Sequence, residues 1–198
     1  MWYKAGKFFF WLFFRVFCGF QVKGGEYLPK SGGFILVSNH VSNLDPIALG
    51  CASSADLYFM AKEELFRNPF FGWLLRKVHA FPLKRKGADL SAIRTAIKRV
   101  NSGGAILIFP EGTRSTDGKL GAPQEGIGFL VEKLNVPVIP AFIKGTEKAM
   151  AKGKVLVRPA KITVRFGKQI SLERRVAHSD VAVSVMQAIK QLSCCESN

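Results

Sequence analysis

Three short apolar runs most constrain what this chain can fold into. They are FILV at 34–37, AILIF at 105–109 and VIPAFI at 138–143, and none contains a charged or hydroxyl side chain. Short apolar runs without alternation are typical of strands buried on both faces, as in a parallel sheet. Segments with helical periodicity separate these runs, which indicates an α/β domain whose helices cover the sheet.

The remaining elements fit the same architecture. We predict one domain over 23–198 with a mixed, largely parallel central sheet flanked by helices, preceded by an N-terminal helix at 1–22. Further strands are predicted at 57–61, 80–83, 155–157 and 162–166. Helices are predicted from Pro46, with Asp45 as its cap, over 62–78 with a break at Pro69, over 89–100 with Asp89 as cap and a stop at Gly103, over 126–135, and through Val181, Val185, Ile189 and Leu192.

The N-terminal segment is unusually aromatic. Residues 8–20 read FFFWLFFRVFCGF, and as a helix these 13 residues span only about 20 Å, whereas a bilayer core is about 30 Å thick. Lys4, Lys7 and Arg15 fall on one narrow stripe opposite a broad aromatic face. We therefore predict a helix that lies in the membrane interface. Core packing is one alternative, and a targeting peptide, which lacks an A-x-A-like cleavage site here, is another.

Charge restricts the partners. The chain has 29 Lys and Arg against 14 Asp and Glu, a net charge of +15, which attracts nucleic acid, anionic membranes or phosphorylated substrates. A hydrophobic content of 48% excludes a disordered basic tail. The cysteines, Cys18, Cys51, Cys194 and Cys195, show no metal-binding spacing, so we expect reduced thiols on the cytosolic side.

Three polar clusters follow predicted strands directly. They are SNHVSNLDP at 38–46, KRK at 84–86 and PEGTRS at 110–115. Ligands of open α/β sheets bind beyond the carboxyl ends of the strands, so parallel strands would bring all three clusters to one edge.

The first cluster contains His40 and Asp45. On a continuous helix they would point about 140° apart, so pairing needs a turn between them, which Asn43 and the Asp-Pro step supply. A carboxylate on one imidazole nitrogen leaves the other as a base, and without a G-x-S-x-G serine a substrate hydroxyl could be its target. In the alternative, Asp45 only caps the helix and His40 is a turn residue. Asn39 and Ser42 fit turn chemistry in either case.

The second and third clusters suit an anion. Arg85 and Arg114 each present a planar fork that matches a phosphate, and Gly112 allows close approach of a ligand. Glu111 could hold one of the guanidinium groups in place. The alternative for 84–86 is a solvated or lipid-facing run of charge.

Together these clusters resemble the glycerophospholipid acyltransferase family, and most closely the bacterial 1-acyl-sn-glycerol-3-phosphate acyltransferases. The motifs occur in the family's order over about half of the chain. They are N-H-x-x-x-x-D at Asn39, His40 and Asp45, F-P-x-x-R at Phe81, Pro82 and Arg85, F-P-E-G-T-R-S at 109–115 and V-P-V-I-P at 136–140.

The resemblance implies a fold like that of glycerol-3-phosphate acyltransferase and a reaction without a metal or bound cofactor. His40 would be the general base and Asp45 would orient it. An acyl group would pass from acyl-CoA or acyl carrier protein to the sn-2 hydroxyl of lysophosphatidate, and the T in E-G-T-R favours this acceptor over glycerol-3-phosphate. The family often has Gln or Arg where Val41 stands here, and a Gly near His79.

The resemblance also implies a phosphate site. Arg85 and Arg114 would hold the acceptor's phosphate, while Glu111, Gly112 and Thr113 would shape the site. We expect the partners to be a membrane surface, a lysophospholipid and the acyl donor, without nucleic acid, at the cytoplasmic face of the cell membrane. The alternatives are an acyltransferase for another acceptor, a hydrolase, and a non-enzymatic binder of anionic membranes or nucleic acid.

Overall fold

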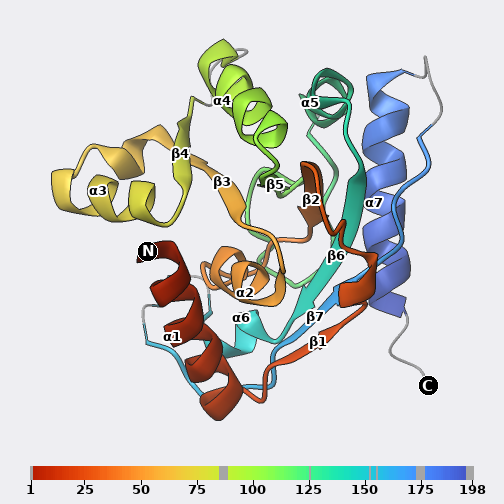
Figure 1. The fold of residues 1–198 in the computed structure, drawn as a ribbon. Coiled ribbons are helices and arrows are strands. Elements are labelled where there is room, and N and C mark those ends of the chain that lie inside the picture. The colour runs from red at the N-terminus through yellow and green to blue at the C-terminus, as the bar shows by residue number, and fades with distance from the viewer. Residues whose placement is uncertain are drawn as a thin grey trace.

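The fold is a central sheet with helices on both faces (Figure 1). The computed structural model describes residues 2–84, 89–124, 126–151, 153–154, 156–172 and 177–194. Within these residues the predicted fold class, a mixed and largely parallel sheet flanked by helices, is confirmed.

The sheet has the strand order β1-β7-β6-β2-β5-β3-β4. Only the β6–β7 pair is antiparallel, and the other five neighbouring pairs are parallel. The strands are β1 Gln21–Lys23, β2 Phe34–Ser38, β3 Leu57–Lys62, β4 Ala80–Leu83, β5 Ala105–Ile108, β6 Val138–Lys144 and β7 Thr163–Phe166.

Helices connect most of these strands. Asp89 caps one of them, because its carboxylate accepts hydrogen bonds from the backbone N–H groups of Ser91 and Ala92. The α-helices are α1 Trp2–Phe17, α2 Asp45–Ala52, α3 Pro69–Lys77, α4 Leu90–Asn101, α5 Gly126–Leu134, α6 Thr146–Ala149 and α7 His178–Cys194, and the 3-10 helices are η1 Gly25–Tyr27 and η2 Glu63–Phe66.

The sheet separates two apolar layers. Alternate residues of β2 point to opposite faces, so Phe34 and Leu36 pack with α1 and α2, whereas Ile35 and Val37 pack with α4, α5 and α7. All four of these side chains are fully buried. This burial on both faces explains why the central strands are continuous apolar runs in the sequence.

Some of the predicted elements differ from the structure, and one strand was not predicted. The strand predicted at 155–157 is wrong at Leu156 and Val157, where the chain is irregular and Leu156 is exposed, while Val155 lies outside the described residues. The break predicted at Pro69 within the helical segment 62–78 is confirmed, because Asn68 caps α3 just before Pro69, but Lys62 belongs to β3 and the part before the break is the 3-10 helix η2. The sequence pattern did not reveal β1, whose three residues are all exposed and pair with β7.

The N-terminal segment is helical, as predicted. Phe14 and Tyr3 are the buried residues of α1, and Lys7 Nζ donates to the carbonyl oxygen of Ser53 at 2.5 Å. Burial lowers the pKa of Lys7 from its usual value. Across the described residues, none of the helices combines the length and the apolar character that crossing a bilayer requires. The division of the chain at residue 22 remains a prediction, and β1 runs across it.

Phe14 anchors α1 to the domain, because it is fully buried and its ring packs against the rings of Phe13 and Phe20 at 5.8 and 5.7 Å. We expect Phe14→Ala to lower the free energy of unfolding by about 3 kcal/mol or more, because it leaves a cavity between α1 and the sheet. Urea unfolding followed by circular dichroism measures this change. Phe8→Ala, at a 65% exposed position of the same helix, is the control and should change the stability little.

Candidate functional site

The site lies at the carboxyl ends of two neighbouring parallel strands. β2 ends at Ser38 and β5 ends at Ile108, and the two strands pair in parallel. This arrangement brings the turn at 39–45 beside the loop at 109–115. The strand before the third cluster, β4, also runs parallel to its neighbour β3, which separates it from β5. The strands that precede the three clusters therefore run parallel to one another, as the prediction requires.

Asp45 organises the turn. Its Oδ2 atom accepts hydrogen bonds from His40 Nδ1 at 2.8 Å and from the backbone N–H groups of Val41 and Ser42 at 2.6 and 2.7 Å. Asp45 is fully buried, so these donors replace the water that a carboxylate would otherwise bind. The turn through Asn43 that the His40–Asp45 pairing requires is present.

The predicted cap at Asp45 is wrong. α2 begins at Asp45 itself, and its N-cap residue, Leu44, makes no side-chain capping hydrogen bond. The Asp45 carboxylate points back into the turn, where one oxygen is already occupied by the His40 ring and two backbone amides. Pro46 fits near the start of the helix because that position needs no N–H donor.

A residue that the sequence analysis missed completes the shell around Asp45. Thr146 Oγ1 donates to Asp45 Oδ1 at 2.5 Å, and Thr146 is fully buried. It lies at the start of α6, where Gly145 has φ 93° and a side chain would collide with the carbonyl group of Lys161. A Gly-Thr pair directly after a buried strand is the signal that could have drawn attention to this position.

His40 is held in one orientation. Because a carboxylate can only accept, His40 Nδ1 carries the proton in this pair, and in the neutral ring Nε2 is then the basic nitrogen. The ring stacks on Phe109 with a centroid distance of 4.0 Å and an interplanar angle of 16°. The side chain keeps 18% of its surface exposed, so a substrate can reach this ring at the sheet edge.

Glu111 joins the two segments of the site. Its Oε1 accepts from the backbone N–H of His40 at 3.1 Å, and its Oε2 accepts from the backbone N–H of Gly121 at 2.9 Å. A further bond runs from the Ser115 N–H to the His40 carbonyl oxygen at 2.8 Å. The buried Glu111 carboxylate therefore fixes the position of the His40 backbone relative to the loop that follows β5.

The loop after Glu111 bears the remaining predicted residues of the third cluster. Gly112 has φ 66°, and a side chain there would come within 2.8 Å of Gln124 Cγ, so the glycine allows this tight turn. Thr113 is exposed and Arg114 is half-buried. The structure thus brings Glu111, Gly112, Thr113 and Arg114 to the same edge as His40.

The second cluster is only partly described. Arg85 and Lys86 lie outside the described residues, and Lys84 is exposed. The backbone N–H of Lys84 donates to Asp89 at 2.8 Å, and this bond is the main reason that the pKa of Asp89 falls to about 2. The end of β4 is thereby tied to the start of α4.

Asn39 and Ser42 have structural roles, as predicted. The Asn39 side chain accepts from the N–H of Ile143 at 2.8 Å and donates to its carbonyl oxygen at 2.9 Å, which joins β2 to β6. Ser42 Oγ donates to the carbonyl oxygen of Met150 at 2.7 Å. Both residues are buried, and these bonds tie the turn to β6 and to the end of α6.

Comparison with known proteins identifies relatives of this chain. Residues 19–144 match the family described as Acyltransferase. A 1-acyl-sn-glycerol-3-phosphate acyltransferase of Bacillus subtilis is 32% identical over 154 residues, which are 77% of this chain and 74% of that protein. A chloroplastic 1-acyl-sn-glycerol-3-phosphate acyltransferase of Brassica napus is 35% identical over 67% of this chain, but the match covers only 39% of that protein.

A solved structure has the same fold. The crystal structure of the 1-acyl-sn-glycerophosphate (LPA) acyltransferase from Thermotoga maritima matches 98% of this chain and 80% of its own chain, with a TM-score of 0.81 and 26% sequence identity.

The Glu111 carboxylate accepts hydrogen bonds from two backbone N–H groups, and this predicts an effect of Glu111 on stability. In Glu111→Gln one acceptor oxygen becomes an NH2 group that faces a backbone N–H, so we expect the free energy of unfolding to fall by about 1–3 kcal/mol. Urea unfolding measures the loss, and hydrogen exchange should accelerate at the amides of His40 and Gly121. Glu26→Gln, at an exposed position, is the matched control. Equal stability of both variants would contradict this role for Glu111.

Proposed function

This chain belongs to the Acyltransferase family, and from that premise we propose that it acylates the sn-2 hydroxyl of 1-acyl-sn-glycerol-3-phosphate (lysophosphatidate), forming phosphatidate. The acyl group comes from a thioester of coenzyme A or of acyl carrier protein. The observation that carries the proposal is the pairing of His40 with the buried Asp45 beside the loop at 109–115.

The proposed reaction uses His40 as general base. Nε2 takes the proton of the sn-2 hydroxyl while the hydroxyl oxygen forms a bond to the thioester carbonyl carbon. The tetrahedral intermediate then collapses, the carbon–sulfur bond breaks, and the leaving thiolate takes the proton back from Nε2. Asp45 holds the ring through Nδ1 and stabilises the imidazolium between these two steps. The thioester is already an activated acyl donor, so we propose that no metal or bound cofactor takes part.

We propose that Arg114 binds the acceptor's phosphate, together with Arg85 of the second cluster. A guanidinium donates to two phosphate oxygens at once, which fixes the acceptor relative to His40. Gly112 and Thr113 shape the loop that carries Arg114. Glu111 acts through this loop, because both of its oxygens already accept backbone hydrogen bonds.

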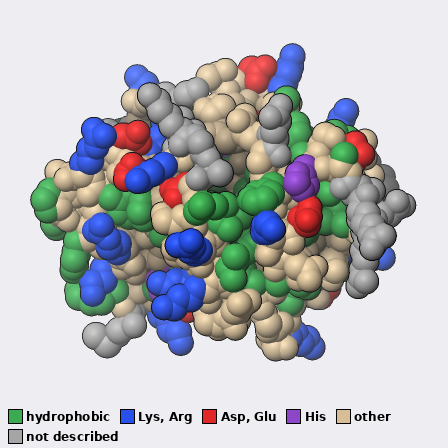
Figure 2. All heavy atoms as spheres, turned by 90° about the horizontal axis from the view of Figure 1, so that it is seen from above, with side chains coloured by type: hydrophobic (Ala, Val, Ile, Leu, Met, Phe, Trp, Pro, Cys, Tyr) green, Lys and Arg blue, Asp and Glu red, His purple; other side chains and the backbone are tan. Residues whose placement is uncertain are grey.

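The acceptor is a lipid, and we propose that the protein reaches it as a peripheral or monotopic protein at the cytoplasmic face of the cell membrane. The exposed surface of α1 supports this, because large apolar side chains make up most of it beside Lys4 and Arg15. Its exposed large side chains are Trp2, Phe8, Phe9, Trp11, Leu12, Val16 and Phe17. Lys and Arg side chains predominate among the charged groups on the face shown in Figure 2, which favours anionic lipid and anionic substrates.

The assignment of the general base predicts the behaviour of one variant. We expect His40→Ala to lower phosphatidate formation at least about 100-fold, because no other group replaces the proton transfer. The assay uses radiolabelled acyl-CoA or acyl-acyl carrier protein with lysophosphatidate in detergent. His178→Ala is the control, since His178 is exposed and paired with Glu132 away from the site.

Two outcomes would contradict the proposal. Full activity of the His40→Ala variant would exclude His40 as the general base. Absence of product with either donor, from folded wild-type protein, would exclude lysophosphatidate as the acceptor, and glycerol-3-phosphate and phosphate-free lysolipids would then be compared.

Membrane association through α1 is tested separately. Replacing Phe8, Phe9 and Phe17 together by Ser should release the protein from vesicles that contain phosphatidylglycerol, because it removes the aromatic side chains that enter the interface. Co-sedimentation measures the bound fraction. Leu90 and Val183 are exposed on α4 and α7, and their double replacement by Ser is the control. Equal sedimentation of the α1 triple variant and this control would contradict a membrane role for α1.

A further inference from the structure

The helix α3 presents an apolar surface that no part of the described domain covers. Gly72 is its only buried residue, although the helix reads PFFGWLLRK. A helix of a soluble domain normally turns its apolar stripe toward the core. Here the exposed apolar side chains include Phe70 at 73%, and they continue onto η2; they are Leu65, Phe70, Phe71, Trp73 and Leu74. A contiguous surface of this kind is typical of a binding site.

This surface is continuous with the exposed face of α1. The rings of Trp2 and Trp73 meet edge to face with a centroid distance of 6.1 Å, and Figure 1 shows α3 beside the N-terminal end of α1. All three tryptophans of the chain, Trp2, Trp11 and Trp73, lie on these two helices. Tryptophan is the residue most characteristic of the membrane–water interface, together with tyrosine.

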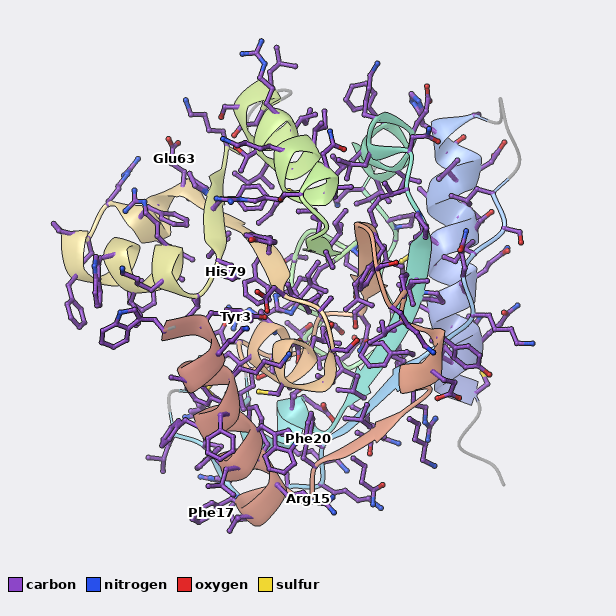
Figure 3. The ribbon with its side chains drawn as sticks, viewed as in Figure 1. Tyr3, Arg15, Phe17, Phe20, Glu63 and His79 are labelled. Atoms are coloured by element: carbon purple, nitrogen blue, oxygen red, sulfur yellow. The ribbon has the colours of Figure 1, made fainter. Side chains whose placement is uncertain are left out.

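A stack of rings holds the two helices in a fixed relation. His79 follows α3, and its ring lies between Tyr3 of α1 at 4.1 Å and Tyr58 of β3 at 4.6 Å, with interplanar angles of 4° and 11°. Figure 3 shows Tyr3 and His79 at this junction. Burial lowers the pKa of His79 and raises that of Tyr3 to about 12, so both rings are neutral in the stack.

The backbone at the junction is specialised as well. His79 has φ 67°, a conformation that favours glycine, and its carbonyl oxygen accepts from Phe59 N–H at 3.2 Å. The family resemblance places a glycine near this position. A non-glycine residue persists in this conformation where its surroundings fix it, and here the two tyrosine rings hold the imidazole. The ring thereby links α1, α3 and β3.

The charges around α3 favour lipid over an uncharged partner. Arg76 lies over the Phe66 ring at 5.3 Å and Lys77 lies over the Trp73 ring at 5.6 Å. Cationic side chains that extend along aromatic rings suit the headgroup region of an anionic bilayer. The acidic residues of η2 are Glu63 and Glu64, and Figure 3 shows Glu63 on the side away from α1.

We propose that α3 is a second membrane-binding element, which forms one bilayer-contacting surface with α1 and inserts Phe70 and Trp73 into the interface of an anionic membrane. This inference rests on the membrane association proposed for α1. Because α3 leads through His79 into β4, and β4 ends at Leu83 directly before the second polar cluster, two attachment points fix how the domain is tilted on the bilayer. The sheet edge that carries His40 then meets the lipid acceptor in one orientation.

Tryptophan fluorescence tests the contact directly. The variant Trp2→Phe/Trp11→Phe retains aromatic side chains on α1 and leaves Trp73 as the only tryptophan. On vesicles of brominated phosphatidylcholine with phosphatidylglycerol, we expect Trp73 emission to shift to the blue and to be quenched. Unchanged emission from vesicle-bound protein would overturn the proposal. Unchanged emission on vesicles, with a shift on addition of acyl carrier protein, would also overturn it and would make α3 a protein-docking surface.

A matched pair of variants measures the contribution of α3. Phe70 is 73% exposed on α3, and Val183 is 47% exposed on α7. We expect Phe70→Ser to weaken vesicle binding about fivefold or more, from the apolar area that it no longer buries, and Val183→Ser to leave binding unchanged. Activity toward lysophosphatidate in detergent should be the same in both.

The outcomes separate the two proposals. If the α1 triple variant loses vesicle binding while Phe70→Ser and Val183→Ser bind as the wild type does, only the role of α3 is wrong. If the wild-type protein itself does not bind the vesicles, membrane association as a whole is wrong.

Discussion

The buried carboxylate of Asp45 is the interaction on which the site depends. It accepts four hydrogen bonds, from the ring of His40, from two backbone amides of the turn and from Thr146. A carboxylate fully removed from water is stable only when such donors surround it, so the turn after β2 and the start of α6 must both be in place. The orientation of the His40 ring is a consequence of that requirement.

A second buried carboxylate, that of Glu111, connects the turn after β2 to the loop after the neighbouring strand β5. Glu111 follows β5 and accepts a hydrogen bond from the backbone N–H of His40, so it links the loop that bears Arg114 to the turn that bears His40. Both acidic motif residues therefore fix backbone and ring positions, and the His40 side chain remains partly exposed at the sheet edge. Near β3 and β4, the stacked rings of Tyr3, His79 and Tyr58 likewise connect distant segments, because they join α1 and the end of α3 to the sheet.

Much of the architecture could be predicted from local patterns. The central apolar runs were located closely, because strands buried on both faces need continuous apolar sequence, and the edge strand at 80–83 was located as well. β1 escaped prediction because its exposed residues are held only by pairing with β7, which is distant in sequence. At Leu156 an apolar residue is exposed, so hydrophobicity alone gave a false strand. Of the predicted site residues, Arg85 lies outside the described residues, and the functional roles of the others remain predictions.

The sequence by itself determined the fold class, the family motifs, the excess of basic charge and the identity of the His40–Asp45 pair. These features depend on residue type and short spacing. Only the tertiary structure decided that Asp45 turns away from a capping role, that Thr146 binds its second oxygen, and that α3 shares its apolar face with α1. Each of these depends on contacts between segments far apart in the chain, and no local pattern records which distant donor or ring will fill a given space.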